Sequence, residues 1–111
     1  MREIIRLLEN PYLDFSDCAD LNDVTVRIDR RIRALLREAE SEDQWAREAV
    51  RRLRSLDPGS PEYRGCAAAV RSRMSKIESA AEARHAEMFA LFSMRVRISG
   101  SPRIDPVRWA N

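Results

Sequence analysis

Glu82 and His85 are the one pair of side chains in this sequence whose types and spacing are typical of a metal site. Glu-x-x-His pairs on two helices, with a glutamate from each of two further helices, hold the di-metal centres of some helical bundles. A dimer could supply the remaining ligands through Glu38 or Glu42. Because Glu82 and His85 lie one position away from the apolar stripe of their helix, we expect an exposed carboxylate and histidine pair, no bound metal and no cofactor.

The other reactive side chains lack the partners that catalysis requires. Cys18 and Cys66 have neither a C-x-x-C motif nor histidine at ligand spacing, so no zinc site is predicted. We expect free thiols in a reducing cytoplasm, and a Cys18–Cys66 disulfide is the alternative. The single histidine has no predictable nucleophile beside it, and the three glycines are too far apart to form a phosphate-binding loop. The sequence therefore predicts no catalytic residues and a protein that is not an enzyme.

The composition is typical of one small soluble domain. The 111 residues include 20 basic and 18 acidic ones, for a net charge of +2, and 44% of the residues are hydrophobic. Charged residues interrupt the apolar cluster at the start of the chain, which is not the pattern of a signal peptide. No apolar run approaches the roughly 20 residues that a transmembrane helix needs, so we expect a cytoplasmic protein without a membrane partner.

Two long helices are predicted from apolar residues that recur at alternating steps of three and four. The first helix is expected over 24–56 and the second over 62–94, with a turn at 57–61 that contains Pro58, Gly59, Ser60 and Pro61. A short connection between helices of similar length predicts an antiparallel hairpin. The two stripes consist of Ile28, Ile32, Leu35, Ala39, Ala46, Ala49, Leu53 and Leu56, and of Tyr63, Ala67, Val70, Met74, Ile77, Ala81, Met88 and Leu91.

Shorter segments flank the predicted hairpin. A short helix is expected over 1–10, followed by a connector over 11–23 that ends with Asn22 or Asp23 as the N-cap of the first long helix. Residues 95–111 are predicted to form an extended tail, in which Trp109 serves as an anchor. The fold class is therefore all-α, with a short N-terminal helix, a long antiparallel hairpin and an extended C-terminal tail.

A two-helix hairpin buries only one stripe on each helix, and other apolar side chains then need a partner. Trp45, Phe89 and Phe92, together with Trp109 in the tail, are the predicted protein-interface residues. We expect a dimer with a coiled-coil-like four-helix arrangement, or a larger protein partner on which this chain acts as an adaptor or inhibitor. The predicted function is that of a non-enzymatic interaction module, such as a self-associating structural subunit.

The predicted hairpin has zones of charge along its length, and one of its basic zones surrounds the predicted turn. Only Lys76 among the 20 basic residues is a lysine, and arginine makes bidentate contacts with carboxylate or phosphate. These arginines are candidate contacts to phosphate or to an acidic partner, with a solvated surface as the simpler interpretation. The alternative function is a small nucleic-acid-binding subunit of a ribonucleoprotein or virion assembly, with weak, salt-dependent affinity. The arginines concerned are Arg51, Arg52, Arg54, Arg64, Arg71 and Arg73.

Overall fold

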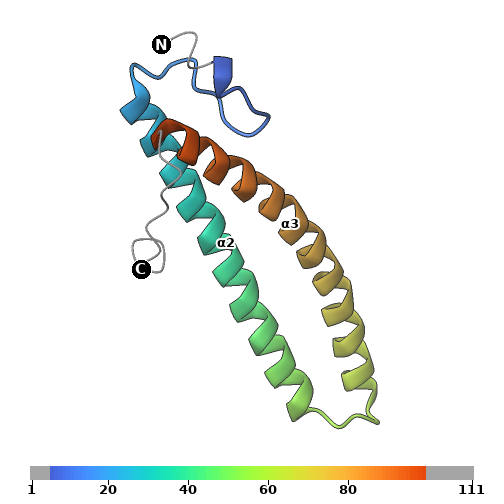
Figure 1. Ribbon diagram of the computed structural model, residues 1–111. Coiled ribbons are helices and arrows are strands. Elements are labelled where there is room, and N and C mark those ends of the chain that lie inside the picture. The colour runs from blue at the N-terminus through green and yellow to red at the C-terminus, as the bar shows by residue number, and fades with distance from the viewer. Residues whose placement is uncertain (1–5, 100–111) are drawn as a thin grey trace. The chain divides into compact units, whose positions relative to one another are not determined.

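The protein is a helical hairpin in a computed structural model that describes residues 6–99 (Figure 1). Helix α2 spans Leu21–Ser55 with 35 residues, and helix α3 spans Pro61–Ser99 with 39 residues. The two helices are the main elements of the described chain, and no strand occurs within residues 6–99. The predicted all-α hairpin is confirmed. The short helix expected over 1–10 lies partly outside the described residues.

The chain divides into two compact units, and both long helices contribute to each of them. Unit 1 comprises Met1–Ile32 and Glu87–Asn111, of which residues 6–32 and 87–99 are described. Unit 2 comprises Arg33–Ala86 and includes the turn between the helices. The two units differ in the number of apolar side chains that they bury.

Unit 1 contains most of the buried apolar side chains of the described chain. The start of α2, the end of α3 and the segment before α2 each contribute to this core, in which Ile28 and Leu91 are completely buried. Ion pairs join the two helices beside it, from Arg31 to Glu87 and from Asp29 to Arg95, and they show that the helices run antiparallel. The core consists of Leu8, Phe15, Cys18, Val24, Ile28, Ile32, Leu91 and Met94.

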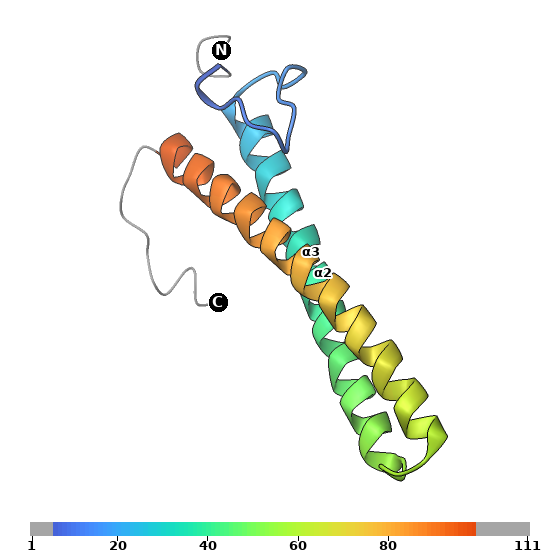
Figure 2. The same cartoon turned by 90° about the vertical axis from the view of Figure 1, so that its right-hand side faces the viewer.

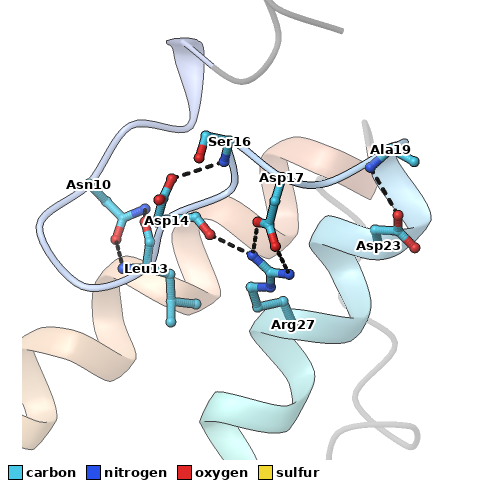
Figure 3. Close-up of polar contacts among 8 residues, drawn as sticks. All are labelled: Asn10, Leu13, Asp14, Ser16, Asp17, Ala19, Asp23 and Arg27. Atoms are coloured by element: carbon cyan, nitrogen blue, oxygen red, sulfur yellow. Dashed lines mark hydrogen bonds and ion pairs between the residues drawn. The ribbon is translucent and has the colours of Figure 1, made fainter.

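The segment before α2 has a defined conformation although it contains no long helix (Figure 3). The Asn10 side chain accepts hydrogen bonds from the backbone N–H of Tyr12 and Leu13, at 2.8 and 2.9 Å. Arg27 on α2 donates to the Asp17 carboxylate at 2.5 and 3.1 Å and to the backbone carbonyl of Asp14 at 2.7 Å. These contacts hold the segment against the first turns of α2.

Helix α2 begins earlier than predicted because a different residue caps it. The Asp20 carboxylate accepts a hydrogen bond from the backbone N–H of Asp23 at 2.9 Å, and the Asp23 carboxylate accepts one from Ala19 N–H at 2.9 Å. This reciprocal arrangement satisfies backbone donors that a helix N-terminus leaves free. The N-cap is thus Asp20, and the prediction of Asn22 or Asp23 in that position is wrong.

Unit 2 has a much thinner apolar core than unit 1. In both views the parts of α2 and α3 that lead to the turn run alongside each other (Figures 1 and 2). Leu35 and Ala49 are the buried hydrophobic residues of this unit, whereas the other members of the predicted stripes within it are half-buried. Arg84 is also buried and pairs with Glu42 on α2.

The turn between the helices has the capping interactions that its sequence predicts. The Ser60 hydroxyl accepts a hydrogen bond from Tyr63 N–H at 3.1 Å and so caps α3. The Asp57 carboxylate accepts one from Gly59 N–H at 3.2 Å, and the Asp57 carbonyl accepts one from Ser60 N–H at 3.0 Å. Pro61 occupies the first position of α3, where a missing N–H costs nothing.

Helix α3 continues to Ser99, so residues 95–99 are helical and the extended conformation predicted for them is wrong. Alternation of arginine and apolar residues is typical of a strand, but here contacts with α2 outweigh it. Arg95 donates to Asp29 at 3.1 Å, and Arg97 lies in the last turn, where a cation is favourable. The rest of the predicted tail, residues 100–111, lies outside the described residues. Neither α2 nor α3, as far as they are described, has an apolar stretch long enough to cross a membrane.

Candidate interaction surfaces

An apolar stripe on α3 in unit 1 contains Phe89, the most exposed large apolar residue of the described chain. We call Phe89, Phe92 and Val96 the outer stripe, since their spacing of three and four residues places them on one face of the helix. Phe89 is 77% exposed, and Phe92 and Val96 are half-buried. In contrast, Leu91 on the opposite side of the same helix is completely buried. Two of the predicted interface residues, Phe89 and Phe92, therefore share one face.

The helix carries no charge around Phe89 and Phe92, and Arg95 is the first charged residue after them. Residues 88–94 are all uncharged, in a chain in which 34% of residues are charged. Ala90 and Ser93 flank Phe89, and the Ser93 hydroxyl donates to the Phe89 carbonyl at 2.8 Å. The Ser93 hydroxyl thus forms its hydrogen bond within α3. This face combines a large exposed aromatic ring with small neighbours, so another helix could approach it closely.

The other two predicted interface residues do not join this stripe. Trp45 lies in unit 2 and is half-buried, and the Arg73 guanidinium lies 4.7 Å from the centre of its ring. Part of the Trp45 surface is therefore already used by a cation–π contact within the unit. Trp109 lies outside the described residues.

Five arginines surround the end of unit 2 that carries the turn, and all five are exposed. None of them forms an ion pair within residues 6–99, whereas the sixth predicted residue, Arg73, stacks on Trp45. Ion pairs elsewhere in unit 2 involve Arg47 and Arg84. We call the five residues the arginine tip: Arg51, Arg52, Arg54, Arg64 and Arg71.

A buried ion pair in unit 2 was not predicted. Arg84 is 7% exposed and donates to the Glu42 carboxylate, with Glu38 a further 4.0 Å contact. The hydrogen bond from Arg84 lowers the pKa of the Glu42 carboxyl, and the same bond raises the pKa of Arg84. The sequence did contain a signal, because Glu42 is the one charged residue within the apolar stripe of α2. A charge at such a position needs a partner on the facing helix.

The residues considered for metal binding or catalysis remain separate from one another. Glu82 and His85 are both exposed, and no group of three potential metal ligands occurs within the described part of the chain. Cys18 and Cys66 are free thiols, and burial raises the pKa of Cys18. A hollow of about 460 Å³ is lined by residues 9–16, where the Asn10 side chain already bonds to its own loop.

Comparisons with family models, with curated proteins and with solved structures give no match for this chain.

Proposed function

We propose that this protein is a non-enzymatic structural subunit that associates with a second copy of itself through the outer stripe. The observation that carries the proposal is the exposure of Phe89, which is 77% exposed in the middle of an uncharged stretch of α3. An aromatic side chain of this size gains considerable free energy when it leaves water. Exposed apolar patches of this kind mark protein interaction sites.

A second copy fits this face because the face is self-complementary. In a symmetric dimer the same surface is used twice, so any charge near the symmetry axis meets its own copy. The uncharged residues 88–94 avoid that repulsion. The Phe89 ring of one copy can lie beside the small residues Ala90 and Ser93 of the other, which resembles the knob-and-hole packing of helical bundles.

The size of the stripe implies a modest affinity. Phe89 is the one largely exposed side chain of the stripe, and its ring can bury roughly 150–200 Å² per copy, well below the roughly 800 Å² that each partner contributes to a standard interface. We therefore expect a dimer that dissociates upon dilution rather than an obligate one. The proposed function is assembly at high local concentration, as in a structural array.

The first test replaces Phe89 by serine and follows the mass in solution. The unaltered chain should shift from its monomer mass of 12.8 kDa toward twice that value as its concentration is raised, in sedimentation equilibrium or light scattering. Phe89→Ser should remain monomeric over the same range, because the largest apolar contact is lost. Since Phe89 is exposed, the Phe89→Ser variant should have the same circular dichroism spectrum as the unaltered chain.

Leu36→Ser provides the matched control, because Leu36 is 51% exposed on α2 and belongs to unit 2, whereas the outer stripe belongs to unit 1. This variant should dimerise like the unaltered chain. A protein that is monomeric at every concentration, or a Phe89→Ser variant that dimerises normally, would refute the proposal. Equal loss of dimer in both variants would point to nonspecific apolar association.

A further inference from the structure

We infer that the arginine tip binds the phosphate backbone of a nucleic acid. This inference concerns unit 2 and is independent of the outer stripe, which lies in unit 1. Residues 51–73 contain six arginines and only two acidic residues, in a chain whose net charge is +2. Residues 24–37 form a second basic stretch, with five arginines and Asp29, but Arg27 and Arg31 in that stretch are paired with Asp17 and Glu87. The five arginines of the tip have no such ion pairs within residues 6–99.

Nearby acidic residues offset only part of the positive charge of the arginine tip, since residues 51–73 hold six arginines and two acidic residues. Asp57 already accepts the Gly59 N–H bond within the turn, and Glu62 forms no ion pair within the described chain. Arg51, Arg52 and Arg54 lie in the last two turns of α2, and Arg64 lies in the first turn of α3. Their guanidinium groups are exposed and available for bidentate contacts with phosphate oxygens.

The surroundings of the arginine tip favour nucleic acid over an acidic protein. A stable protein interface needs a desolvated apolar centre in which a few side chains supply most of the energy. Among the large exposed apolar residues of the described chain, only Val50, at 45% exposure, lies next to the tip. Binding to a phosphate backbone requires no such centre, because it is driven by charge and by the release of counterions.

The geometry predicts a small number of phosphate contacts. Arg64 and Arg71 are seven residues apart on α3, or about 10 Å along the helix axis. The tip can therefore contact about three phosphates. On duplex DNA, a plot of the logarithm of the association constant against the logarithm of the salt concentration should then have a slope of about −3. No base contacts are implied, so the affinity should depend little on sequence.

The test uses fluorescence anisotropy of a labelled mixed-sequence DNA duplex and the matching single strand, with the full chain titrated between about 50 and 200 mM salt. Arg51→Gln with Arg52→Gln should weaken binding about tenfold at the lower salt concentration and reduce the slope by about 1–2. Arg33→Gln with Arg37→Gln removes the same charge from exposed positions of α2 in the same unit, away from the tip. This control pair should weaken binding less than twofold.

The inference is supported if the tip variant loses affinity selectively and both proteins retain their helical circular dichroism. Absence of binding to either nucleic acid at the lower salt concentration would refute it, and so would equal losses in the two double variants. Tighter binding to phosphatidylserine vesicles or to polyglutamate than to the duplex would also overturn it. Those results would assign the arginine tip to a membrane surface or to an acidic protein instead.

Discussion

At the scale of single residues, charged side chains as well as apolar ones form the contacts between α2 and α3. Arg84 in unit 2 and Glu87 in unit 1 are both buried on α3, and each has a partner on α2. Replacing one partner of such a pair leaves the other charge buried without compensation, which is costly. These pairs therefore favour one register of α3 against α2 over alternatives shifted by one turn.

Because Glu42 forms an ion pair with Arg84, we expect the stability of the fold to depend on pH. Because the pKa of Glu42 is lowered in the folded protein from its ordinary value of 4.5, its charged form stabilises the fold above about pH 4.5, and this contribution disappears as the pH falls through the folded-state pKa. Glu42→Gln should lower the free energy of unfolding by about 1–2 kcal/mol at pH 7 and by much less at pH 3.

Urea denaturation followed by circular dichroism at several pH values measures this effect. Glu40→Gln is the matched control, since Glu40 is exposed on α2 and forms no ion pair within residues 6–99. Its effect should be small at every pH. If Glu42→Gln and Glu40→Gln gave the same pH profile, the pair with Arg84 would not stabilise the fold.

At the scale of elements, local hydrogen bonds determine where each helix begins, and contacts between helices determine how far α3 extends. Asp20 and Ser60 cap the two helices through side-chain acceptors. At the other end of α3, the ion pair of Arg95 with Asp29 lies in the part that the local sequence pattern would have made extended. Tertiary contacts thus outweigh strand propensity in this segment.

Exchange of the N-cap residue of α2 tests the assignment. Asp20→Ala should lower the free energy of unfolding by about 1 kcal/mol, because the Asp23 N–H loses its acceptor, whereas Asp20→Asn should have little effect, as asparagine also caps helices well. Asn22→Ala serves as the control, because Asn22 is one of the two residues that the sequence predicts as the N-cap. A larger loss in Asn22→Ala than in Asp20→Ala, measured by urea denaturation, would show that the cap is assigned to the wrong residue.

At the scale of the whole molecule, the two units differ in how much apolar surface they bury. Unit 1 contains eight of the ten buried hydrophobic residues of the described chain, whereas unit 2 contains only Leu35 and Ala49. Local stability follows buried apolar contacts, so unit 2 should open more readily than unit 1. Its exposed turn end is also where the arginine tip lies, and binding there would stabilise the weaker unit.

Amide hydrogen exchange measures this difference directly. We expect the amides of residues 24–32 and 88–94 to exchange more slowly than those of residues 50–54 and 64–70, because the former belong to the unit with the larger core. Peptide-level mass spectrometry resolves these regions. Equal protection in both units would show that the molecule opens only as a whole, and would contradict this account.

The apolar spacing of the sequence was sufficient to predict two helices, their hairpin connection and the face of each helix that is shielded from solvent. Every residue of the two predicted stripes is buried or half-buried, and so is Glu42, the charged residue at a stripe position of α2. The exposure of Phe89 and of the arginines around the turn also agrees with their positions off these stripes. Periodicity carries this information because it depends only on helix geometry.

Only the tertiary structure decided the features that depend on residues distant in sequence. The choice of Asp20 among several closely spaced acidic residues depends on where the chain turns before α2. The helical residues 95–99 include Arg95, whose partner Asp29 lies on the other helix. The pairing of Arg84 with Glu42 and the stacking of Arg73 on Trp45 likewise require both helices in register. Spacing within one helix specifies a face, whereas the partner of each side chain on that face is determined only when the other helix packs against it.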